Sequence, residues 1–244
     1  MIKISAVINN YNYGRYLPRA VESVLAQDFP ADQMEIIIVD DGSTDDSAER
    51  AAAYGERVIY HRQENRGQAG ALNAGFARAR GAYVALLDAD DEWLPGKLRK
   101  VIARFEANLK TGLVQHWMRT VDAEGRPLPT YVEHWPERYA FDDLRTGRAR
   151  FVGTSGLAFR KEGVKGILPI PEDLRFCADE YLYTHVLFKT EAENIPEMLG
   201  LRRVHGTNSY AGTLLKPEAL ERRIRVRQSL DAHLAERCRG LSLA

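Results

Sequence analysis

The sequence is poor in cysteine, in long apolar runs and in net charge, and each shortage excludes a class of protein. Its 244 residues hold two cysteines, Cys177 and Cys238, without CxxC or CxxH spacing, so neither a disulfide framework nor a zinc site is expected. No stretch approaches the ~20 apolar residues that span a bilayer, and no signal peptide follows Met1. Lys and Arg number 34, as do Asp and Glu, so no overall field draws the chain to nucleic acid. A cytoplasmic protein without nucleic-acid partners is expected.

Apolar segments alternate with amphipathic ones over the first 120 residues. Strands are expected at 3–9, 35–39, 57–61, 83–87 and 113–117. Helices are expected at 17–25, 47–54, 69–80 (ended by Gly81) and 98–109, the last with Leu109 on its apolar face. Strands that alternate with helices predict an α/β fold with a mostly parallel, Rossmann-like central sheet flanked by helices.

The pattern weakens after residue 120. Residues 122–150 are interrupted by Pro and Gly and read as irregular, and regular segments return at 151–159, 179–187 and 195–205. We divide the chain into a domain over 1–215, with halves 1–120 and 121–215, and a C-terminal helical extension over 216–244. Residues 216–239 hold seven Lys or Arg against four Asp or Glu. A solvated helix face explains this excess better than contact with an anionic membrane, and both interpretations stay open.

The segment Val39-Asp40-Asp41-Gly42-Ser43-Thr44-Asp45 follows a buried strand and precedes a helix. In open parallel sheets, ligands bind beyond the carboxyl ends of the strands. A carboxylate placed there can accept hydrogen bonds from an amide or ribose hydroxyl of a nucleotide. The alternative is a strand-to-helix turn whose acids cap the helix.

The segment from Leu86 to Glu92 holds three aspartates, Asp88, Asp90 and Asp91, at the mouth of another buried strand. Carboxylates this close repel one another unless a cation is present. Alternate spacing points Asp88 and Asp90 to one side of an extended backbone. The pair suits one divalent cation, Mn²⁺ or Mg²⁺, which bridges to diphosphate oxygens, although a solvated acidic loop is the alternative.

Four segments occur in order: VINNYN, VDDGSTD, NRGQAGALNAG and LLDADDEW. This ordered set resembles the nucleotide-binding half of GT-A glycosyltransferases of family 2, closely over residues 3–120 and loosely beyond. The resemblance implies a GT-A fold and an inverting transfer of a sugar from a nucleoside diphosphate donor. The QxxRW motif of processive polysaccharide synthases is absent, which argues against long-chain polymerisation.

The resemblance also implies roles for particular residues. Tyr11 would stack on the nucleotide base beside Asn9, Asp40 would hold the base, and Asp88 would face the ribose. Ala89, Asn73 and Arg66 complete the nucleotide-sugar-binding set, with Arg66 placed to reach a phosphate. Asp90 would bind the metal, and His205 would complete its shell or touch the diphosphate. An ordinary structural role explains His205 and the Arg66 loop equally well.

A third acidic segment, Cys177-Ala178-Asp179-Glu180-Tyr181, resembles the family's catalytic motif at a helix start. Asp179 takes the place of the acid that deprotonates the acceptor, and Glu180 is the second candidate. The usual form is Glu-Asp, so Ala178 departs from the pattern, and helix-capping acids are the alternative.

The predicted function is metal-dependent, inverting glycosyl transfer, with a UDP-sugar as the favoured donor and a saccharide or lipid-linked acceptor. The basic C-terminal helix would fit a location at the inner face of the membrane. The sequence does not predict an oligomeric state. Two alternatives come from other classes: a nonenzymatic nucleotide-sugar-binding protein and a DxD-type phosphatase. The phosphatase would need its nucleophilic aspartates in the first strand, which ends instead in Asn9-Asn10.

Overall fold

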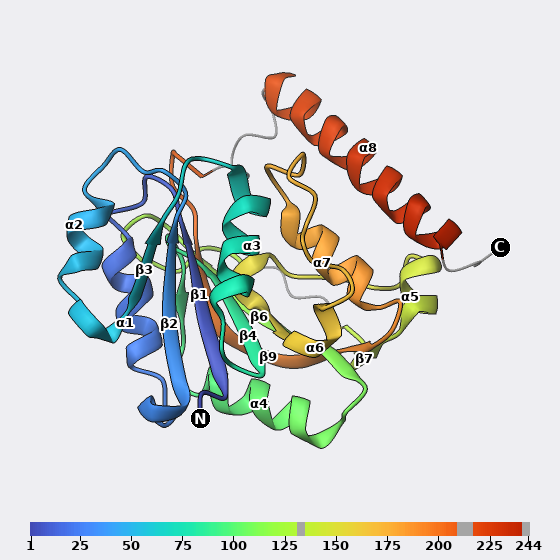
Figure 1. Ribbon diagram of the computed structural model, residues 1–244, viewed down its shortest axis with the longest axis horizontal. Coiled ribbons are helices and arrows are strands. Elements are labelled where there is room, and N and C mark those ends of the chain that lie inside the picture. The colour runs from blue at the N-terminus through green and yellow to red at the C-terminus, as the bar shows by residue number, and fades with distance from the viewer. Residues whose placement is uncertain (131–134, 209–216, 241–244) are drawn as a thin grey trace.

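A nine-stranded sheet runs through the computed structural model, which describes residues 1–130, 135–208 and 217–240 (Figure 1). The strands are β1 (Ile4–Asn10), β2 (Met34–Asp40), β3 (Ile59–Arg62), β4 (Tyr83–Asp88), β5 (Glu92–Trp93), β6 (Thr111–Val121), β7 (Arg138–Tyr139), β8 (Leu157–Arg160) and β9 (Glu191–Arg203). Their order across the sheet is β3-β2-β1-β4-β8-β6-β9-β5, and β7 pairs with β9.

Most of these strands run in one direction. β3, β2, β1 and β4 are parallel neighbours, with Asn9 of β1 opposite both Val39 of β2 and Asp88 of β4. β8 is antiparallel to β4 and to β6, so β6 and its parallel neighbour β9 share the direction of β4. The predicted mostly parallel sheet is confirmed, and the antiparallel strands β5, β7 and β8 all belong to the part of the sheet beyond β4.

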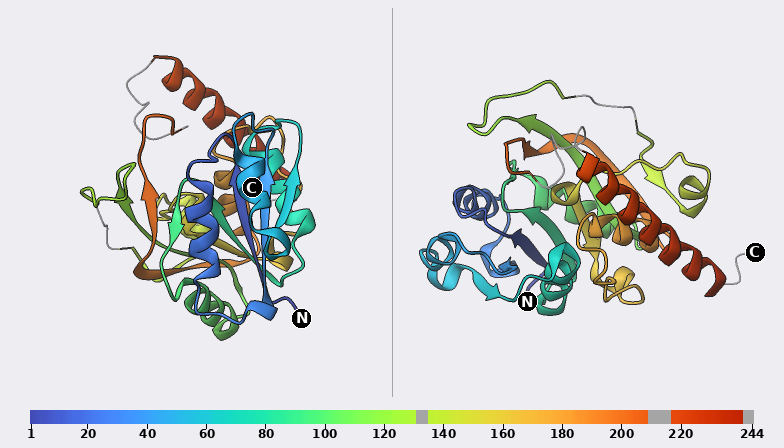
Figure 2. Two further views of the ribbon diagram at one scale, coloured as in Figure 1. Left: turned by 90° about the vertical axis from the view of Figure 1, so that its left-hand side faces the viewer. Right: turned by 90° about the horizontal axis from the view of Figure 1, so that it is seen from above.

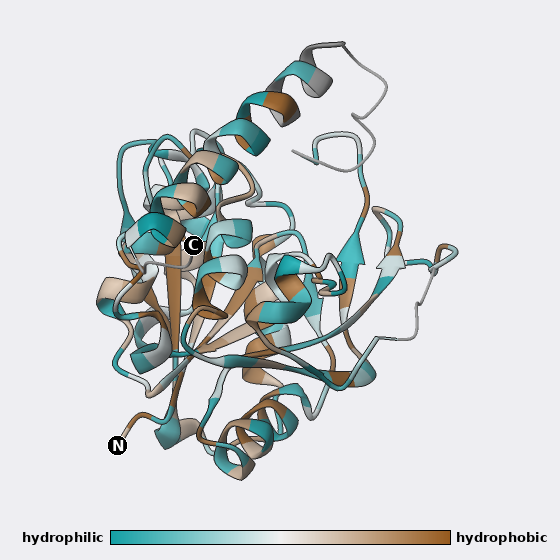
Figure 3. Cartoon of the chain, turned by 90° about the vertical axis from the view of Figure 1, so that its right-hand side faces the viewer, coloured by the Kyte–Doolittle hydropathy of each residue, from teal (hydrophilic) through white to brown (hydrophobic). Residues whose placement is uncertain are grey.

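Helices cover both faces of the sheet (Figures 1 and 2). They are α1 (Leu17–Leu25), α2 (Ser47–Ala52), α3 (Gly67–Arg78), α4 (Lys97–Ala107), α5 (Phe141–Arg145), α6 (Lys161–Val164), α7 (Ala178–Val186) and α8 (Pro217–Gly240). Alternate residues of β1 explain the two layers: Ile4 and Ile8 pack with α1 and α4, and Val7 packs with α3 and α7. The strands are therefore apolar on both faces and brown in the interior in Figure 3.

Three details of the expected elements were wrong. The third helix ends at Arg78, with Ala79 extended, so Gly81 does not end it. Gly81 instead passes the first strand closely, where an added Cβ would lie 2.7 Å from the backbone nitrogen of Ser5. Leu109 lies beyond α4 and is 82% exposed, and residues 122–150 contain β7 and α5.

The C-terminal helix α8 lies along α7 on the outside of the molecule (Figures 1 and 2). Leu230 is buried against the core on its inner side, and Arg227 Nη1 lies 3.0 Å from Oε1 of Glu180. No helix among the described residues is long and apolar enough to cross a membrane. The expected boundary at residues 215 and 216 lies outside the described residues.

Candidate active site

A cleft of about 1010 Å³ opens where the parallel strands β1, β2 and β4 end. Because carboxyl ends of neighbouring parallel strands share one edge of a sheet, the polar residues that follow these strands meet there. Six predicted site residues line the cleft: Asn9, Tyr11, Asp88, Asp90, Asp179 and Glu180. They come from both halves of the chain, and Val226, Arg227 and Leu230 of α8 form part of the wall.

The acidic loop after β4 places several carboxylates close together in a buried environment. Burial raises the pKa of Asp88 well above its ordinary value, and the charges of Asp90, Asp91 and Asp179 raise it further, whereas the Asn9 amide opposes the rise. Burial and the charge of Asp90 also raise the pKa of Asp91. This crowding indicates a site for a positively charged group.

Asp90 and His205 meet although 115 residues separate them. His205 Nε2 lies 3.1 Å from Oδ2 of Asp90, and the imidazole stacks on Tyr16 with ring centroids 4.6 Å apart. Asn208 Nδ2 donates a 3.0 Å hydrogen bond to the same carboxylate oxygen. No group of three or more His, Cys, Asp or Glu in the described ranges is arranged to hold a metal by itself. Asp90 and His205 are the two side chains of this loop region that would hold a divalent cation, through a carboxylate oxygen and an imidazole nitrogen.

Asp179 lies at the start of α7 and faces the cleft with 9% of its surface exposed. Its carboxylate accepts hydrogen bonds of 3.1 Å from Oγ1 of Thr154 and from the backbone N–H of Glu180. Burial raises the pKa of Asp179, and these hydrogen bonds limit the rise. Glu180 also lines the cleft, but its carboxylate is ion-paired with Arg227 of α8.

The two aspartates after β2 point to different places. Asp40 is fully buried and does not line the cleft. Its carboxylate accepts a 2.7 Å hydrogen bond from the Ser43 backbone N–H and another from the Tyr60 hydroxyl. Asp41 lines the cleft, where it accepts the backbone N–H groups of Arg66 and Gly67 at 2.9 and 2.8 Å. The structure therefore does not bring Asp40 to the position expected for a base-binding acid, because its side chain is buried in the turn outside the cleft.

Tyr11 and Asn9 lie at the same end of the cleft. Tyr11 is 48% exposed, so a ring face is available to a ligand, and Asn9 is almost fully buried beside Asp88. Ala89 has no exposed surface, and its backbone N–H donates a 3.0 Å hydrogen bond to the carbonyl of Asn9. Ala89 thus holds the acidic loop to β1 instead of lining the cleft.

Arg66 and Asn73 belong to α3 and its start, and neither lines the cleft. The Arg66 guanidinium is ion-paired with Glu172, so it is turned away from the expected phosphate position. The Asn73 amide donates to the carbonyl of Ile170 at 2.8 Å and accepts its N–H at 2.7 Å. Both side chains attach the loop before α7 to α3.

The residues that sequence reasoning missed come mainly from distant segments. Arg175 lines the cleft, where its guanidinium donates to the side-chain oxygen of Asn65. Its backbone passes Gly67 so closely that a Cβ there would lie 2.8 Å from the Arg175 Cα, and Gly67 has a φ of +74°. Five aromatic residues line the same cleft, Trp117, Trp135, Phe151, Phe176 and Tyr183, and the rings of Phe151 and Tyr183 are stacked. The glycines of the segment NRGQAG predicted a close approach of another group at Gly67, but no sequence pattern predicted the aromatic residues of the cleft.

Comparisons with known proteins identify the fold and the family. An uncharacterized glycosyltransferase of Nostoc sp. (strain PCC 7120) is 40% identical over 220 residues, which are 86% of this chain and 67% of the relative. S. aureus TarS 1–349, solved in complex with UDP, matches with a TM-score of 0.69 at 22% identity, over 83% of this chain and 61% of that one. The mannosyltransferase PcManGT from Pyrobaculum calidifontis, solved with GDP-Man and Mn²⁺, matches with a TM-score of 0.64 at 20% identity, over 86% and 59%.

These structural matches identify the fold as GT-A, as the sequence predicted. The chain spans 61% and 59% of the two solved chains, so neither is matched over its whole length. The family model for glycosyl transferase family 2 matches residues 5–168, which is more than half of the sequence. The chain belongs to glycosyl transferase family 2.

Proposed function

We propose that this glycosyltransferase moves a sugar from a nucleoside diphosphate, with UDP as the favoured carrier, to an acceptor hydroxyl with inversion at the anomeric carbon. One observation carries the proposal. Asp88, Asp90 and Asp179 line one cleft, and Asp179 is near enough for its charge to raise the pKa of Asp88. A metal-ligating acid and a basic carboxylate can therefore serve one substrate there.

The donor end of the cleft would lie in the half formed by residues 1–120. The half-exposed Tyr11 ring is suited to stack on the nucleotide base, and Asn9 and Asp88 lie beside it. We transfer the base-binding role from Asp40 to Asp41, because Asp41 lines the cleft and Asp40 does not. TarS was solved with UDP and with UDP-GlcNAc, which supports uracil as the nucleotide base, whereas PcManGT was solved with GDP-Man. The assay below compares the nucleotides.

Asp90 and His205 would hold the divalent metal, Mn²⁺ or Mg²⁺. When bound, such an ion stabilises negative charge on a departing diphosphate. Asn208 donates to Oδ2 of Asp90 at 3.0 Å, and Tyr16 stacks on His205, so both proposed ligands are held in place by the chain itself. Carboxylate and imidazole together fit Mn²⁺ well.

Asp179 would act as the general base. It takes the proton of the acceptor hydroxyl, whose oxygen forms a bond to the anomeric carbon from the face opposite the diphosphate. The bond between the anomeric carbon and the diphosphate oxygen breaks, and its electron pair leaves with the nucleotide. Glu180 is less suited to this role because Arg227 holds its carboxylate at 3.0 Å.

The acceptor would lie against the five aromatic residues of the cleft, four of which (Trp135, Phe151, Phe176 and Tyr183) belong to residues 121–215. Aromatic rings pack well against the apolar faces of sugar rings, which favours a saccharide acceptor. Val226 and Leu230 of α8 add apolar surface to the cleft, which would suit the lipid of a lipid-linked acceptor. The proposal also places the enzyme in the cytoplasm at the inner face of the membrane, with α8 in peripheral contact with the lipid. Family membership favours transfer over the nonenzymatic and DxD-phosphatase alternatives.

The test is an assay of the purified chain with UDP-, GDP- and dTDP-sugars, Mn²⁺ and a panel of saccharide acceptors. We expect nucleotide release with a UDP-sugar, an anomeric configuration in the product opposite to that of the donor by NMR, and almost complete loss of transfer in Asp90→Asn or in EDTA. Asp142→Asn, which changes an exposed surface acid, is the matched control. Retention of configuration, or full activity of Asp90→Asn, would overturn the mechanism.

A further inference from the structure

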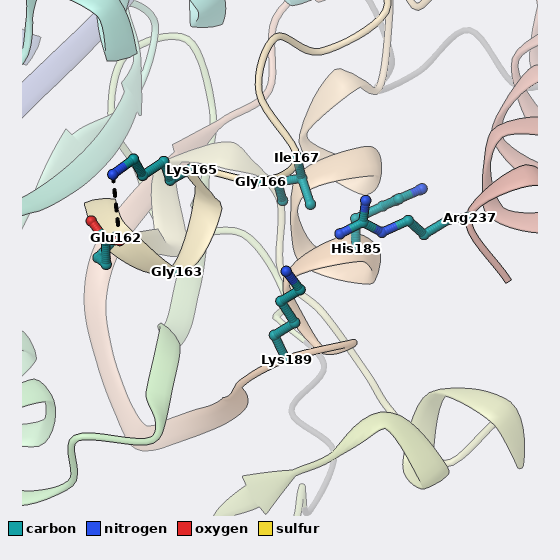
Figure 4. A pocket seen from close by; sticks show the side chains of 8 residues that line it. All are labelled: Glu162, Gly163, Lys165, Gly166, Ile167, His185, Lys189 and Arg237. Atoms are coloured by element: carbon teal, nitrogen blue, oxygen red, sulfur yellow. Dashed lines mark ion pairs between the residues drawn. The ribbon is translucent and has the colours of Figure 1, made fainter. Parts of the chain in front are cut away.

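A second cavity, of about 370 Å³, lies outside the catalytic cleft (Figure 4). It lies between the end of α6, the end of α7 and the last turns of α8. Its lining consists of Glu162, Gly163, Lys165, Gly166, Ile167, His185, Lys189 and Arg237. None of these residues lines the catalytic cleft, so the second cavity is a separate site. Its volume falls within the range of small-molecule sites.

Two cationic side chains converge on one point of this cavity. A Cβ placed on Gly166 would lie 3.7 Å from Nζ of Lys189 and 4.0 Å from Nη2 of Arg237. Neither cation has a carboxylate within ion-pairing distance in the described part of the chain. The third basic residue, Lys165, differs because it turns away from Lys189 and pairs with Glu162 at 3.7 Å (Figure 4). The exposed Lys189 and the half-buried Arg237 therefore approach the same point of the cavity, and neither is paired with a carboxylate of the described residues.

Polar atoms of the same wall lack partners. His185 is 2% exposed, and its Nδ1 lies 2.9 Å from the carbonyl of Tyr181, to which it must donate. Its Nε2 is buried and has no hydrogen-bond partner among the described residues, and the same is true of Nε of Arg237. Buried polar atoms of native proteins nearly always have partners. The Nε–H of Arg237 is a donor and needs an acceptor, such as a phosphate oxygen, whereas Nε2 of His185 is left as an acceptor and needs a donor, such as the hydroxyl of a hydrogen phosphate.

We propose that this cavity binds a phosphate group, free or as a monoester, held between Lys189 and Arg237. A phosphate oxygen supplies the acceptor that Nε of Arg237 lacks, and the fork of an Arg with the point charge of a Lys is suited to phosphate oxygens. The cavity is larger than a bare phosphate, so an ester fits it as well. Since Lys189 follows α7 and Arg237 belongs to α8, the ligand would fasten the end of α8 to the core. α8 lines the catalytic cleft through Val226 and Leu230, so this attachment would hold the wall of the acceptor site.

Calorimetric titration with inorganic phosphate and with glycerol phosphate tests the site. We expect wild type to bind at least one of them, and the double variant Lys189→Gln/Arg237→Gln to bind at least about tenfold more weakly. Arg239→Gln removes one positive charge from an exposed position of α8 and is the control, with unchanged affinity. Near-UV circular dichroism checks that each variant is folded. Affinities within twofold of wild type in the double variant would overturn the proposal.

Vesicles of phosphatidylcholine, with or without phosphatidic acid, separate the two sources of the phosphate group. Binding to phosphatidic acid vesicles that is lost in the double variant and kept in Arg239→Gln assigns a lipid headgroup. Binding of glycerol phosphate without vesicle binding assigns a soluble ester. If wild type binds phosphate, glycerol phosphate and phosphatidic acid vesicles no better than a protein without the site, the proposal is wrong.

A tethered carboxylate gives an independent test. Gly166→Asp would place a carboxylate between Lys189 and Arg237, with its Cβ at ordinary contact distance from both. We expect this variant to melt at a higher temperature than Gly166→Asn and to lose the response to phosphate, while Gly166→Asn keeps part of it. Equal melting temperatures with an intact phosphate response would contradict the proposal. Because no residue of this cavity belongs to the catalytic cleft, failure here leaves the proposed transfer reaction untouched, and failure of that reaction leaves this site testable.

Discussion

The Ser155 hydroxyl donates a 2.6 Å hydrogen bond to Oδ2 of Asp91, which precedes it by 64 residues. The same hydroxyl accepts the backbone N–H of Asp88 at 3.0 Å, and the Ser155 carbonyl accepts Nε1 of Trp93 and Nζ of Lys97 at 2.9 and 3.1 Å. These groups are mostly buried, so little water competes for the bonds. Ser155, which precedes β8, thus positions the acidic loop that follows β4.

Ser155→Ala should therefore disturb the acidic loop without removing a proposed metal ligand or the proposed general base. The buried Asp91 carboxylate loses its hydroxyl partner, which costs about 1–3 kcal/mol of stability. We expect the concentration of Mn²⁺ that gives half-maximal transfer to rise by about tenfold, because the loop no longer fixes Asp90. Thermal unfolding and a manganese titration of the transfer rate measure the two effects.

Ser5→Ala is the control for Ser155→Ala, because Ser5 has the same contacts at the opposite end of the sheet. Its hydroxyl donates to Glu35 at 2.6 Å and accepts the backbone N–H of Gly81 at 2.9 Å. We expect a similar loss of stability in Ser5→Ala and no change in the manganese requirement. Equal manganese titrations of the two variants would show that Ser155 acts only on stability.

The ion pair between Glu180 and Arg227 distinguishes the two candidates for the general base. Asp179→Asn should lower the transfer rate by ~10²-fold or more with nearly unchanged donor affinity, because only the proton transfer is lost. Glu180→Gln should have a milder effect that Arg227→Gln reproduces, since both variants break one contact between α7 and α8. Single-turnover rates and donor affinities are the measurement, and the reverse ranking would transfer the base role to Glu180.

The elements of the sheet and the ends of its strands could be predicted from sequence because they depend on local patterns. Continuous apolar runs such as Ile36–Val39 are buried on both faces of the sheet, and polar residues follow where each strand ends. The shared edge then brings Asn9 and Asp88 together without any further information. Asp179 was predicted from a motif, and the fold places it in the same cleft.

What the sequence did not predict depends on side-chain direction and on distant contacts. Nothing local separates the role of Asp40 from that of Asp41, and the fold shows that the Asp40 carboxylate accepts hydrogen bonds from the Ser43 N–H and the Tyr60 hydroxyl. Likewise Arg66 is drawn away by Glu172, which lies 106 residues later. Ser155 stands in the segment Gly153-Thr154-Ser155-Gly156, which carries no recognisable motif, so its bond to Asp91 could be found only in the fold.

Tyr11 and Asp40 should respond to substitution in opposite ways. Tyr11→Ala removes a half-exposed ring, so we expect an unchanged melting temperature and a weaker affinity for UDP, by ~1–3 kcal/mol if the ring stacks on the base. Asp40→Ala leaves the buried Ser43 N–H and Tyr60 hydroxyl without an acceptor, which should cost about 1–3 kcal/mol of stability. The UDP affinity of Asp40→Ala should stay within about twofold of wild type, because Asp40 does not line the cleft. Calorimetry and thermal unfolding would measure both, and loss of UDP binding in folded Asp40→Ala would restore the base-binding role to Asp40.

The pH dependence of transfer should report the buried environment of Asp179. A general base works only when it is unprotonated, so the rate should fall as the pH falls through the pKa of this carboxyl. Because burial raises that pKa, the fall should begin at a higher pH than for an exposed aspartate. The rate at saturating donor and metal, measured against pH, gives the midpoint.

Thr154→Val tests whether Asp179 is the group responsible. The Thr154 hydroxyl donates to Oδ2 of Asp179 at 3.1 Å and so favours the ionised form. Without this hydrogen bond the pKa of Asp179 should rise further, and the acid limb of the profile should move to higher pH. Thr190→Val, which removes a hydroxyl bonded to the carbonyl of Val186, should not move it.

The raised pKa of Asp179 affects the stability of the fold with the opposite sign to its effect on activity. A folded-state pKa above the unfolded one means that the folded protein holds the proton to higher pH, so its stability decreases as the pH rises through this range. Asp179→Asn should remove that decrease, and a profile that Thr154→Val leaves unmoved would assign the acid limb to another group.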